Sequence, residues 1–194
     1  CIRDSLNYDV PDRTFDIWSA FIQDKFALVP EELFLTVGTK FEHNDFTGYE
    51  YQPSARVSWL VDKAQTLWAS VARAVRTPSR NEDDINLVLQ AIPPGTLLGP
   101  GTPVAFGSEL GSQLNESEEM IAYEIGYRTQ PHERISVDVT TFYNDYTNIR
   151  TADGPAAPFV DTRGLTPHLV LPFLLANNAS AFTYGAEVAA EWDV

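Results

Sequence analysis

The stretch EEMIAYEIGYRTQPHERISVDVTTFYNDYTNIR, residues 118 to 150, alternates between apolar and polar side chains in two successive segments. In the first segment one row consists of Ile121, Tyr123, Ile125 and Tyr127. After residues 129–133 the corresponding row consists of Ile135, Val137, Val139, Thr141 and Tyr143. Because side chains on a β-strand point to opposite faces in turn, each segment has one apolar and one polar face. The stretch therefore predicts two strands, and it raises the question whether their apolar face meets a protein core or lipid.

The same period of two recurs along the chain between turn signals. The predicted strands lie near residues 14–26, 32–44, 50–60, 65–76, 118–128, 134–146 and 182–194. The first of these is the least regular and gives no face assignment. In the fourth, Arg73 interrupts an otherwise apolar row. The pattern predicts an all-β fold of antiparallel up-and-down strands, about seven in number.

The connections between these strands differ in length. Residues 29–32, 61–65 and 129–133 are short turns, whereas residues 77–117 and 147–181 are long loops rich in glycine and proline. Both long loops leave the same end of the sheet, because an even number of strands separates them. Within the second, residues 169–175 are apolar enough to fold inward or to form a short helix. Short turns at one end and long loops at the other are typical of transmembrane β-barrels.

The composition of the chain argues against several classes of function and of site. The 194 residues carry a formal net charge of -14, which argues against nucleic-acid binding because phosphates need a basic surface. The single cysteine, Cys1, allows no internal disulfide and no zinc site built from cysteines. Residues 1–14 are polar and do not resemble a signal peptide. The last residues read as an unfinished strand, so we expect the chain to be a piece of a larger protein.

The lengths of the predicted strands favour the interpretation that their apolar face meets lipid and not a protein core. A strand that crosses a membrane at a tilt of about 45° needs about 9 to 11 residues, and these segments reach that length. Aromatic residues near the ends of the apolar rows suit the membrane interface, although the core of a soluble sandwich would also take them. Arg73 fits poorly, because it would face lipid. It could snorkel towards the nearby loop end, or a β-bulge could shift the register.

Two stretches resemble the barrel of TonB-dependent outer-membrane receptors. They are YEYQPSARVSWLVDKAQTLWASVARAVRTPSR and LNESEEMIAYEIGYRTQPHERISVDVTTFYNDYTNIRT. The more specific signal combines RTPS at residues 76–79 with the pattern of Glu119, AYE at 122–124 and GYR at 126–128. The resemblance covers residues 17–194 apart from the long loops.

The resemblance implies a barrel of about 22 strands whose lumen is filled by a plug domain. It implies a receptor in the outer membrane of a Gram-negative bacterium, not an enzyme, in contact with outer-membrane lipid. Such receptors import scarce nutrients, commonly ferric siderophores or cobalamin, with energy delivered by TonB. Nothing in the chain matches a plug or a TonB-contacting segment. Two alternatives stay open: a passive porin-like barrel, and a soluble all-β sandwich that binds carbohydrate.

Candidate contact residues fall into two groups. Arg76, Arg80, Arg150 and Arg163 lie at the loop end of the sheet, where they could attract an anionic ferric chelate or pair with acidic neighbours and lipid phosphates. Arg56, Glu124, Arg128 and Asp138 belong to the polar rows and would face the lumen, where they could contact the plug or a ligand. Glu124 and Arg128 lie on the same face of one strand, and each is expected to find a partner on an adjacent strand.

We expect no catalytic residues, no cofactor and no metal site. The motifs of common hydrolases and nucleotide-binding proteins are absent from the sequence. His43, His132 and His168 are isolated and are expected at the surface or in loops. Residues 81–84, NEDD, could hold a cation through carboxylate oxygens, but the simpler expectation is a solvated acidic loop.

Overall fold

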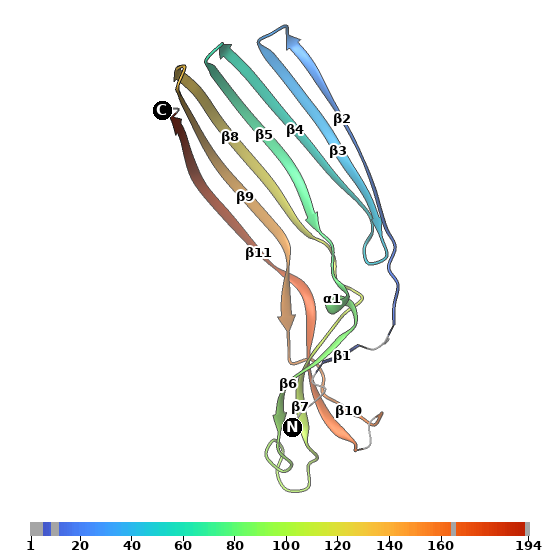
Figure 1. The fold of residues 1–194 in the computed structure, drawn as a ribbon. Helices are drawn as coiled ribbons and strands as arrows, with labels where there is room; N and C mark the ends of the chain where they lie inside the picture. Colours follow the sequence, from blue (N-terminus) through green and yellow to red (C-terminus); the bar gives the residue numbers. More distant parts are fainter. Residues whose placement is uncertain (1–5, 9–11, 164–165, 193–194) are drawn as a thin grey trace. The chain divides into compact units, whose positions relative to one another are not determined.

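A computed structural model of the chain describes residues 6–8, 12–163 and 166–192. These residues form eleven strands and one short helix (Figure 1). The chain divides into two compact units. Unit 1 consists of residues 1–15, 77–117 and 150–179, and unit 2 consists of residues 16–76, 118–149 and 180–194. Strands β9 and β11 contribute residues to both units. Within the described residues, no helix has the length and apolar character needed to cross a membrane.

Seven long strands lie wholly or partly in unit 2 and correspond to the seven predicted segments. They are β2 (Ile17–Val29), β3 (Leu33–Asn44), β4 (Gly48–Asp62), β5 (Gln65–Arg76), β8 (Glu118–His132), β9 (Ile135–Asp153) and β11 (His168–Trp192). Their order in the sheet is β11-β9-β8-β5-β4-β3-β2. The pairs from β2 to β9 are all antiparallel. The prediction of an all-β fold with antiparallel up-and-down strands is therefore confirmed.

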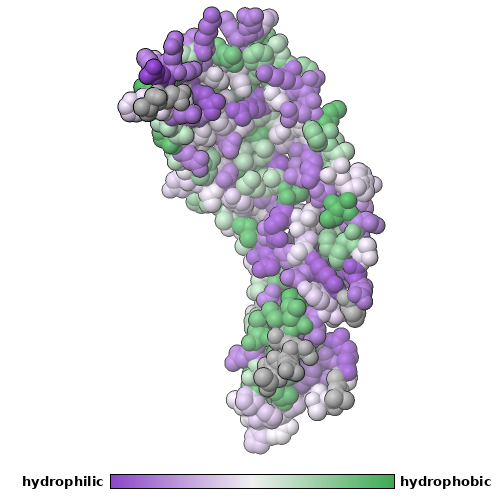
Figure 2. Space-filling model, viewed as in Figure 1, coloured by the Kyte–Doolittle hydropathy of each residue, from purple (hydrophilic) through white to green (hydrophobic). Residues whose placement is uncertain are grey.

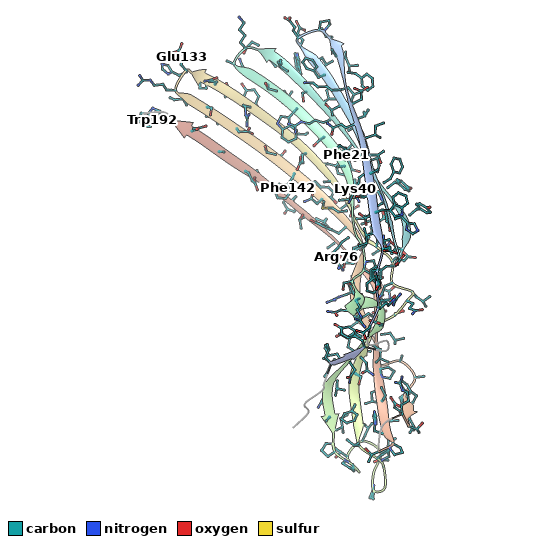
Figure 3. The ribbon with its side chains drawn as sticks, turned by 45° about the vertical axis from the view of Figure 1, so that its right-hand side comes forward. Phe21, Lys40, Arg76, Glu133, Phe142 and Trp192 are labelled. Carbon is teal, nitrogen blue, oxygen red and sulfur yellow. The ribbon has the colours of Figure 1, made fainter. Side chains whose placement is uncertain are left out.

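The register of these strands joins the predicted apolar rows into one face. Ile125 of β8 lies opposite Ala69 on one side and Thr141 on the other. The same register assigns the irregular first strand, because Trp18 lies opposite His43 and thus joins the apolar row. Figure 3 shows side chains leaving both faces of the sheet in unit 2.

The apolar face of unit 2 is not a protein core. Ile125 is 58% exposed and Val188 is 70% exposed, and the buried hydrophobic residues of the described chain all belong to unit 1. In Figure 2 hydrophilic residues gather at the short-turn end of unit 2 and mix with hydrophobic residues further along the strands. A single sheet with an uncovered apolar face contradicts the alternative of a soluble sandwich, whose two sheets would bury that face against each other.

Two strands, β9 and β11, extend far into the segments that were predicted to be long loops. β9 continues to Asp153 instead of ending near residue 146, and β11 begins at His168 instead of near residue 182. Of the two alternatives for residues 169–175, the short helix is therefore wrong. Residues 169–174 pair in parallel with residues 105–110 of β7, and this pairing keeps them extended.

Unit 1 shows that the two long loops contain regular structure. Its elements are β1 (Leu6–Tyr8), α1 (Arg80–Asp84), β6 (Ile85–Ile92), β7 (Ala105–Leu110), β10 (Phe159–Asp161) and the adjoining parts of β9 and β11. Strands β1, β6, β7 and β11 are neighbours in that order, and β10 pairs with β11. A small core of Ile85, Ala105, Val170 and Leu175 lies within this unit. Burial of these side chains stabilises the loops as a folded part of the chain.

Candidate functional site

Three of the predicted lumen residues meet in one groove on the polar face of unit 2. The register places Arg128 of β8 directly between Thr66 of β5 and Asp138 of β9. The groove has a volume of about 280 Å³. It is lined by Arg56, Thr66, Trp68, Arg128, Asp138 and Thr140. Because the strands alternate, polar side chains from β4, β5, β8 and β9 converge on this face.

The groove has an excess of positive charge. Arg128 donates to Asp138 from Nε at 2.8 Å, as the expected partner on an adjacent strand. The Arg56 guanidinium stacks over the ring of Trp68, 3.9 Å from its centroid. Within the part of the chain that the structure describes, Arg56 has no ion pair. Two guanidinium groups and one carboxylate leave a net positive site that suits an anion or a carboxylate-bearing peptide.

Gly126 creates the space in which Trp68 lies. Trp68 and Gly126 are opposite each other on β5 and β8. A Cβ added at Gly126 would lie 2.3 Å from the nearest indole atom of Trp68. The indole therefore covers the glycine and offers its other surface to Arg56, an arrangement that fixes the guanidinium by a cation–π contact.

Replacing Gly126 by alanine should lower the free energy of unfolding by about 1–2 kcal/mol, because the indole must leave its place. The double variant Gly126→Ala/Trp68→Leu should recover much of that loss, since leucine is smaller than the indole. Denaturant titration of the single and double variants measures both values. If the loss of stability in the double variant equalled the sum of the losses in Gly126→Ala and Trp68→Leu, the proposed packing of Trp68 on Gly126 would be contradicted.

Glu124 lies on the same face but outside this groove. Its carboxylate accepts a hydrogen bond from Ser70 Oγ at 3.1 Å, and Ser70 is its direct neighbour across the strand pair. Glu124 thus also finds its partner on an adjacent strand, as predicted. A second groove of about 370 Å³ adjoins Arg128 near the short turns, lined in part by Lys63, Gln130 and Glu191.

Arg73 lies in the apolar row, as the alternation predicts, because it is opposite Ile121 without a shift of register. The alternative of a bulge at this position is therefore wrong. The pairing of β4 with β5 ends at Ser54 and Ala72. The next residue of β4, Pro53, has no backbone N–H to donate to β5, and a proline in an inner strand interrupts pairing.

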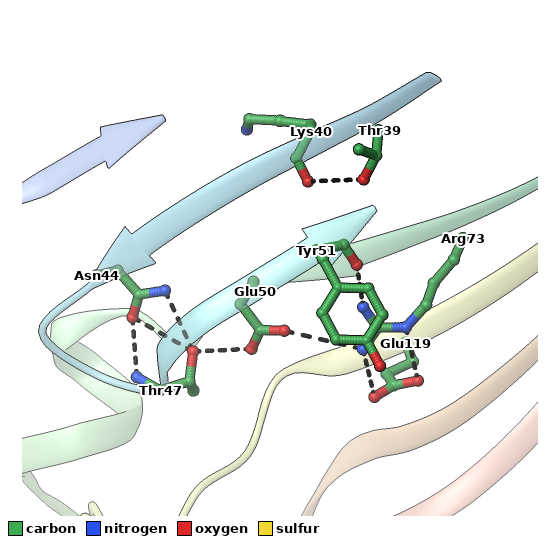
Figure 4. Close-up of polar contacts among 8 residues, drawn as sticks. All are labelled: Thr39, Lys40, Asn44, Thr47, Glu50, Tyr51, Arg73 and Glu119. Carbon is green, nitrogen blue, oxygen red and sulfur yellow. Dashed lines mark hydrogen bonds and ion pairs between the residues drawn. The ribbon is translucent and has the colours of Figure 1, made fainter. Parts of the chain in front are cut away.

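The side chain of Arg73 occupies the gap that opens between β4 and β5 (Figure 4). Its guanidinium donates to both carboxylate oxygens of Glu119, at 3.1 and 2.7 Å, and to the backbone carbonyl oxygen of Tyr51. Glu50 lies 3.8 Å away, and Thr47 donates to the Glu50 carboxylate at 2.9 Å. The charge of Arg73 is thus neutralised by two carboxylates on neighbouring strands, which removes the cost of an isolated cation on an apolar face.

The four arginines expected at the loop end each lie beside an acidic residue. In unit 2, Arg76 Nε donates to Glu118 at 2.7 Å. In unit 1, Arg80 approaches Asp84 at 3.4 Å, Arg150 approaches Glu82 at 3.8 Å, and Arg163 approaches Asp161 at 2.9 Å. Three of the four therefore belong to unit 1 and are spread over different elements of it. Pairing with acidic neighbours, one of the two expectations for these residues, is what the structure shows.

The pair of Arg163 and Asp161 sets the ionisation of one loop carboxyl. The Arg163 side chain donates hydrogen bonds to both carboxylate oxygens of Asp161, and the Arg163 backbone N–H donates to Oδ1 as well. These hydrogen bonds lower the pKa of the Asp161 carboxyl from 3.8 to about 2. Asp161 ends β10 and lies opposite His168 of β11.

Replacing Arg163 by glutamine should raise the pKa of Asp161 towards its ordinary value, though not fully, because the backbone N–H remains. Since the folded pKa is depressed, the pair stabilises the β10–β11 hairpin above about pH 4 and this contribution is lost as the pH falls towards 2. Carboxyl NMR of Asp161 against pH measures the shift in both proteins. An unchanged titration in the variant would contradict the role of the guanidinium.

The acidic segment 81–84 is not the solvated loop that its composition suggests. It forms most of helix α1, and Glu82 and Asp84 are only 3% and 5% exposed. Glu82 accepts a hydrogen bond from the backbone N–H of Ser79 at 2.6 Å, which caps the helix. Within the described residues, no group of three or more histidine, cysteine, aspartate or glutamate side chains could hold a metal ion.

The sequence patterns missed Trp68, which is central to the groove. Trp68 lies in the polar row of β5, where alternation predicts a hydrophilic residue. The feature of the sequence that could have indicated its position is Gly126 on the partner strand, which leaves room for the indole. His43 was expected to be isolated, but it stacks on Trp18 at 5.6 Å and contacts Tyr49 at 4.6 Å, between ring centroids. His168 likewise contacts the ring of Phe106 at 4.8 Å.

Comparisons with known sequences identify similar proteins. The chain is 28% identical over 137 residues to the ferric enterobactin receptor of Pseudomonas aeruginosa, which corresponds to 68% of this chain and 17% of that protein. It is 25% identical over 170 residues to the iron-regulated outer membrane virulence protein of Vibrio cholerae, or 88% of this chain and 24% of that protein. The chain therefore spans less than a quarter of the length of these curated relatives.

Comparison of structures agrees on the fold. The siderophore receptor PirA from Acinetobacter baumannii matches with a TM-score of 0.75 at 19% identity, over 92% of this chain and 26% of that one. A mutant of the ferric enterobactin receptor from Pseudomonas aeruginosa in complex with enterobactin matches with a TM-score of 0.71 at 24% identity, over 90% of this chain and 24% of that one. The family model described as TonB dependent receptor-like, beta-barrel, matches residues 2–194. The chain belongs to the β-barrel family of TonB-dependent receptors.

Proposed function

We propose that the chain forms part of an outer-membrane receptor that imports a ferric siderophore with energy supplied through TonB. The observation that carries the proposal is the uncovered apolar face of unit 2, opposite a polar face with a positively charged groove. Strands of this kind suit a wall between lipid and an aqueous lumen. Relatives named as ferric enterobactin receptors support an iron chelate as the ligand.

The two groups of candidate residues suit different tasks. Arg80, Arg150 and Arg163 have acidic neighbours in unit 1, so an anionic ligand would have to compete with these carboxylates. In unit 2, Arg76 has an acidic neighbour as well. We propose that these four residues hold the loops in shape and meet the ligand only at the surface.

The polar-face groove suits a contact inside the lumen. Arg56 and Arg128 expose guanidinium groups there beside the Asp138 carboxylate, and the Glu124 carboxylate lies on the same face outside the groove. We propose that these residues contact the plug domain or a ligand passing it. When TonB acts on the plug domain, the plug would move and open a passage through the lumen for the ligand.

Growth of a deletion strain on a panel of ferric siderophores and cobalamin tests the proposed function. We expect loss of growth on one ferric siderophore as sole iron source, restored by the gene on a plasmid and unaffected by cobalamin supply. The same growth should require TonB. Growth that is lost in the deletion strain but independent of TonB would favour the passive porin-like barrel, and unchanged growth on every iron chelate would contradict the proposal.

A further inference from the structure

Asp24 places a charge in the apolar row of β2, near the middle of the strand. The register sets it opposite Val37 of β3, and its neighbours in the row are Ile22 and Phe26. Ile22 is 66% exposed, and Phe26 and Val37 are exposed as well, so this part of the face is apolar and uncovered. On a face that meets lipid, a carboxylate costs free energy unless a cation neutralises it.

The described residues supply no cation for Asp24. Its carboxylate accepts a hydrogen bond from the backbone N–H of Lys25 at 2.8 Å. The ammonium group of Lys25 belongs to the opposite face, where it lies 4.2 Å from the centroid of the Phe34 ring. Within the part of the chain that the structure describes, Asp24 therefore has no ion pair.

Arg73 shows how this sheet accommodates a charge in an apolar row. The carboxylates of Glu119 on β8 and Glu50 on β4, the strands on either side of β5, lie 2.7 and 3.8 Å from its guanidinium. Neighbouring strands thus supply the opposite charge. On β3 the residue opposite Asp24 is Val37, so the cation for Asp24 has to come from the other side of β2.

The other side of β2 is a free edge in the described sheet, because the strand order ends at β2. The backbone N–H and C=O groups that point away from β3 need hydrogen-bond partners, which hydrocarbon cannot provide. A strand that pairs with this edge brings a side chain of its own to the position opposite Asp24 on the same face.

Neither edge of unit 2 can supply the missing cation. The apolar row of β2 contains no basic residue, so two copies paired through β2 would leave both Asp24 carboxylates without a cation. Residues 180–192, the part of β11 in unit 2, contain no lysine or arginine either. This excludes closure onto β11 and head-to-tail pairing with a second copy as sources of the cation. The source that fits is another part of the receptor, because the chain spans less than a quarter of the length of its relatives.

We propose that a strand from the remainder of the receptor pairs with the free edge of β2 and carries a lysine or arginine that faces Asp24 on the lipid side. The ion pair would also fix the register of that strand, because a slip by one residue moves the basic side chain to the other face. The proposal rests on the proposed function in one respect, the placement of this face against lipid. It does not depend on the transported ligand.

Denaturant titration of the complete receptor in lipid vesicles tests the proposal through the sign of one effect. We expect Asp24→Leu to raise the equilibrium constant for unfolding about tenfold or more, because it leaves a cation in hydrocarbon without its partner. Asp24→Glu keeps the charge, and Phe26→Leu is the control in the same row. Both should change the constant by less than about threefold. An Asp24→Leu receptor at least as stable as the wild type would show that the carboxylate had no cation and would overturn the proposal.

Two further measurements guard against a variant that fails to assemble. Dicyclohexylcarbodiimide, an apolar reagent for protonated carboxyl groups, should leave Asp24 of the wild-type receptor unmodified at neutral pH in a mass spectrum. An adduct at Asp24 would overturn the proposal. A spin label at Ile22 separates the proposal from the proposed function. Relaxation by oxygen supports the placement against lipid, whereas relaxation only by a water-soluble nickel complex would overturn the placement on which both depend.

Discussion

Replacement of Gly111 by alanine is expected to raise the equilibrium constant for local opening of the contact between helix α1 and the loop of residues 111–115 about a hundredfold. A Cβ at this position would lie 2.6 Å from the backbone carbon of Asp83 and 2.6 Å from the backbone nitrogen of Asp84. Backbone atoms cannot rotate away as a side chain can, so the loop must separate from the helix. Hydrogen exchange at the Ser112 N–H, which bonds Glu82, measures this opening.

Gly107 of β7 provides the matched control. A Cβ there would have its nearest neighbour at 3.8 Å, an ordinary van der Waals distance. Gly107→Ala should therefore leave exchange at Ser112 within a factor of about two of the wild type. If Gly111→Ala behaved like Gly107→Ala, the close approach of the loop to helix α1 would be refuted.

Replacing Arg73 by methionine is expected to lower the free energy of unfolding by about 2 kcal/mol. The change leaves the Glu119 carboxylate and the Tyr51 carbonyl oxygen without their guanidinium donor. Loss of one partner of a buried ion pair costs about 3–5 kcal/mol. Because the Glu119 side chain is 34% exposed, solvent screens its ion pair with Arg73, and the expected loss of stability is smaller than for a fully buried pair. Denaturant titration in lipid or detergent measures the loss.

A double-mutant cycle separates the ion pair from packing. Glu119→Gln alone leaves Arg73 beside Glu50 and should cost less than Arg73→Met. The double variant Arg73→Met/Glu119→Gln should be more stable than the sum of the single losses predicts, by about 1 kcal/mol or more. If the losses of stability in the two single variants added up to the loss in the double variant, Arg73 would act through its aliphatic part and its contact with the Tyr51 ring, not through the ion pair.

The alternation predicted the long strands of unit 2 because one face of each strand is polar and the other is not. Ile121 to Tyr127 and Ile135 to Tyr143 lie on a common face in the register that the structure shows. The strands of unit 1 could not be predicted in this way. Glycine and proline mark turns around β6 and β7, and the parallel pairing of β7 with β11 joins segments far apart in the sequence.

The candidate site was predicted in part. Partners for Glu124 and Arg128 on adjacent strands follow from the alternation, and the structure supplies Ser70 and Asp138. The position of Trp68 depends on Gly126 across the strand pair, which a single strand does not reveal. The burial of Glu82 and Asp84 depends on the loop of residues 111–115, which is distant in the sequence, and on a helix cap. Composition alone therefore indicated a solvated segment.

The central claim is that the exposed apolar face of unit 2 meets hydrocarbon and its polar face meets an enclosed aqueous space. Spin labels at Tyr123, Ile125, Val137 and Val139 test it in the protein reconstituted in lipid, with labels at Ser136 and Thr140 of the polar face for comparison. We predict that oxygen dissolved in the bilayer relaxes the first set and that a water-soluble nickel complex relaxes only the second. Relaxation of the first set by the nickel complex, without an effect of oxygen, would contradict the account.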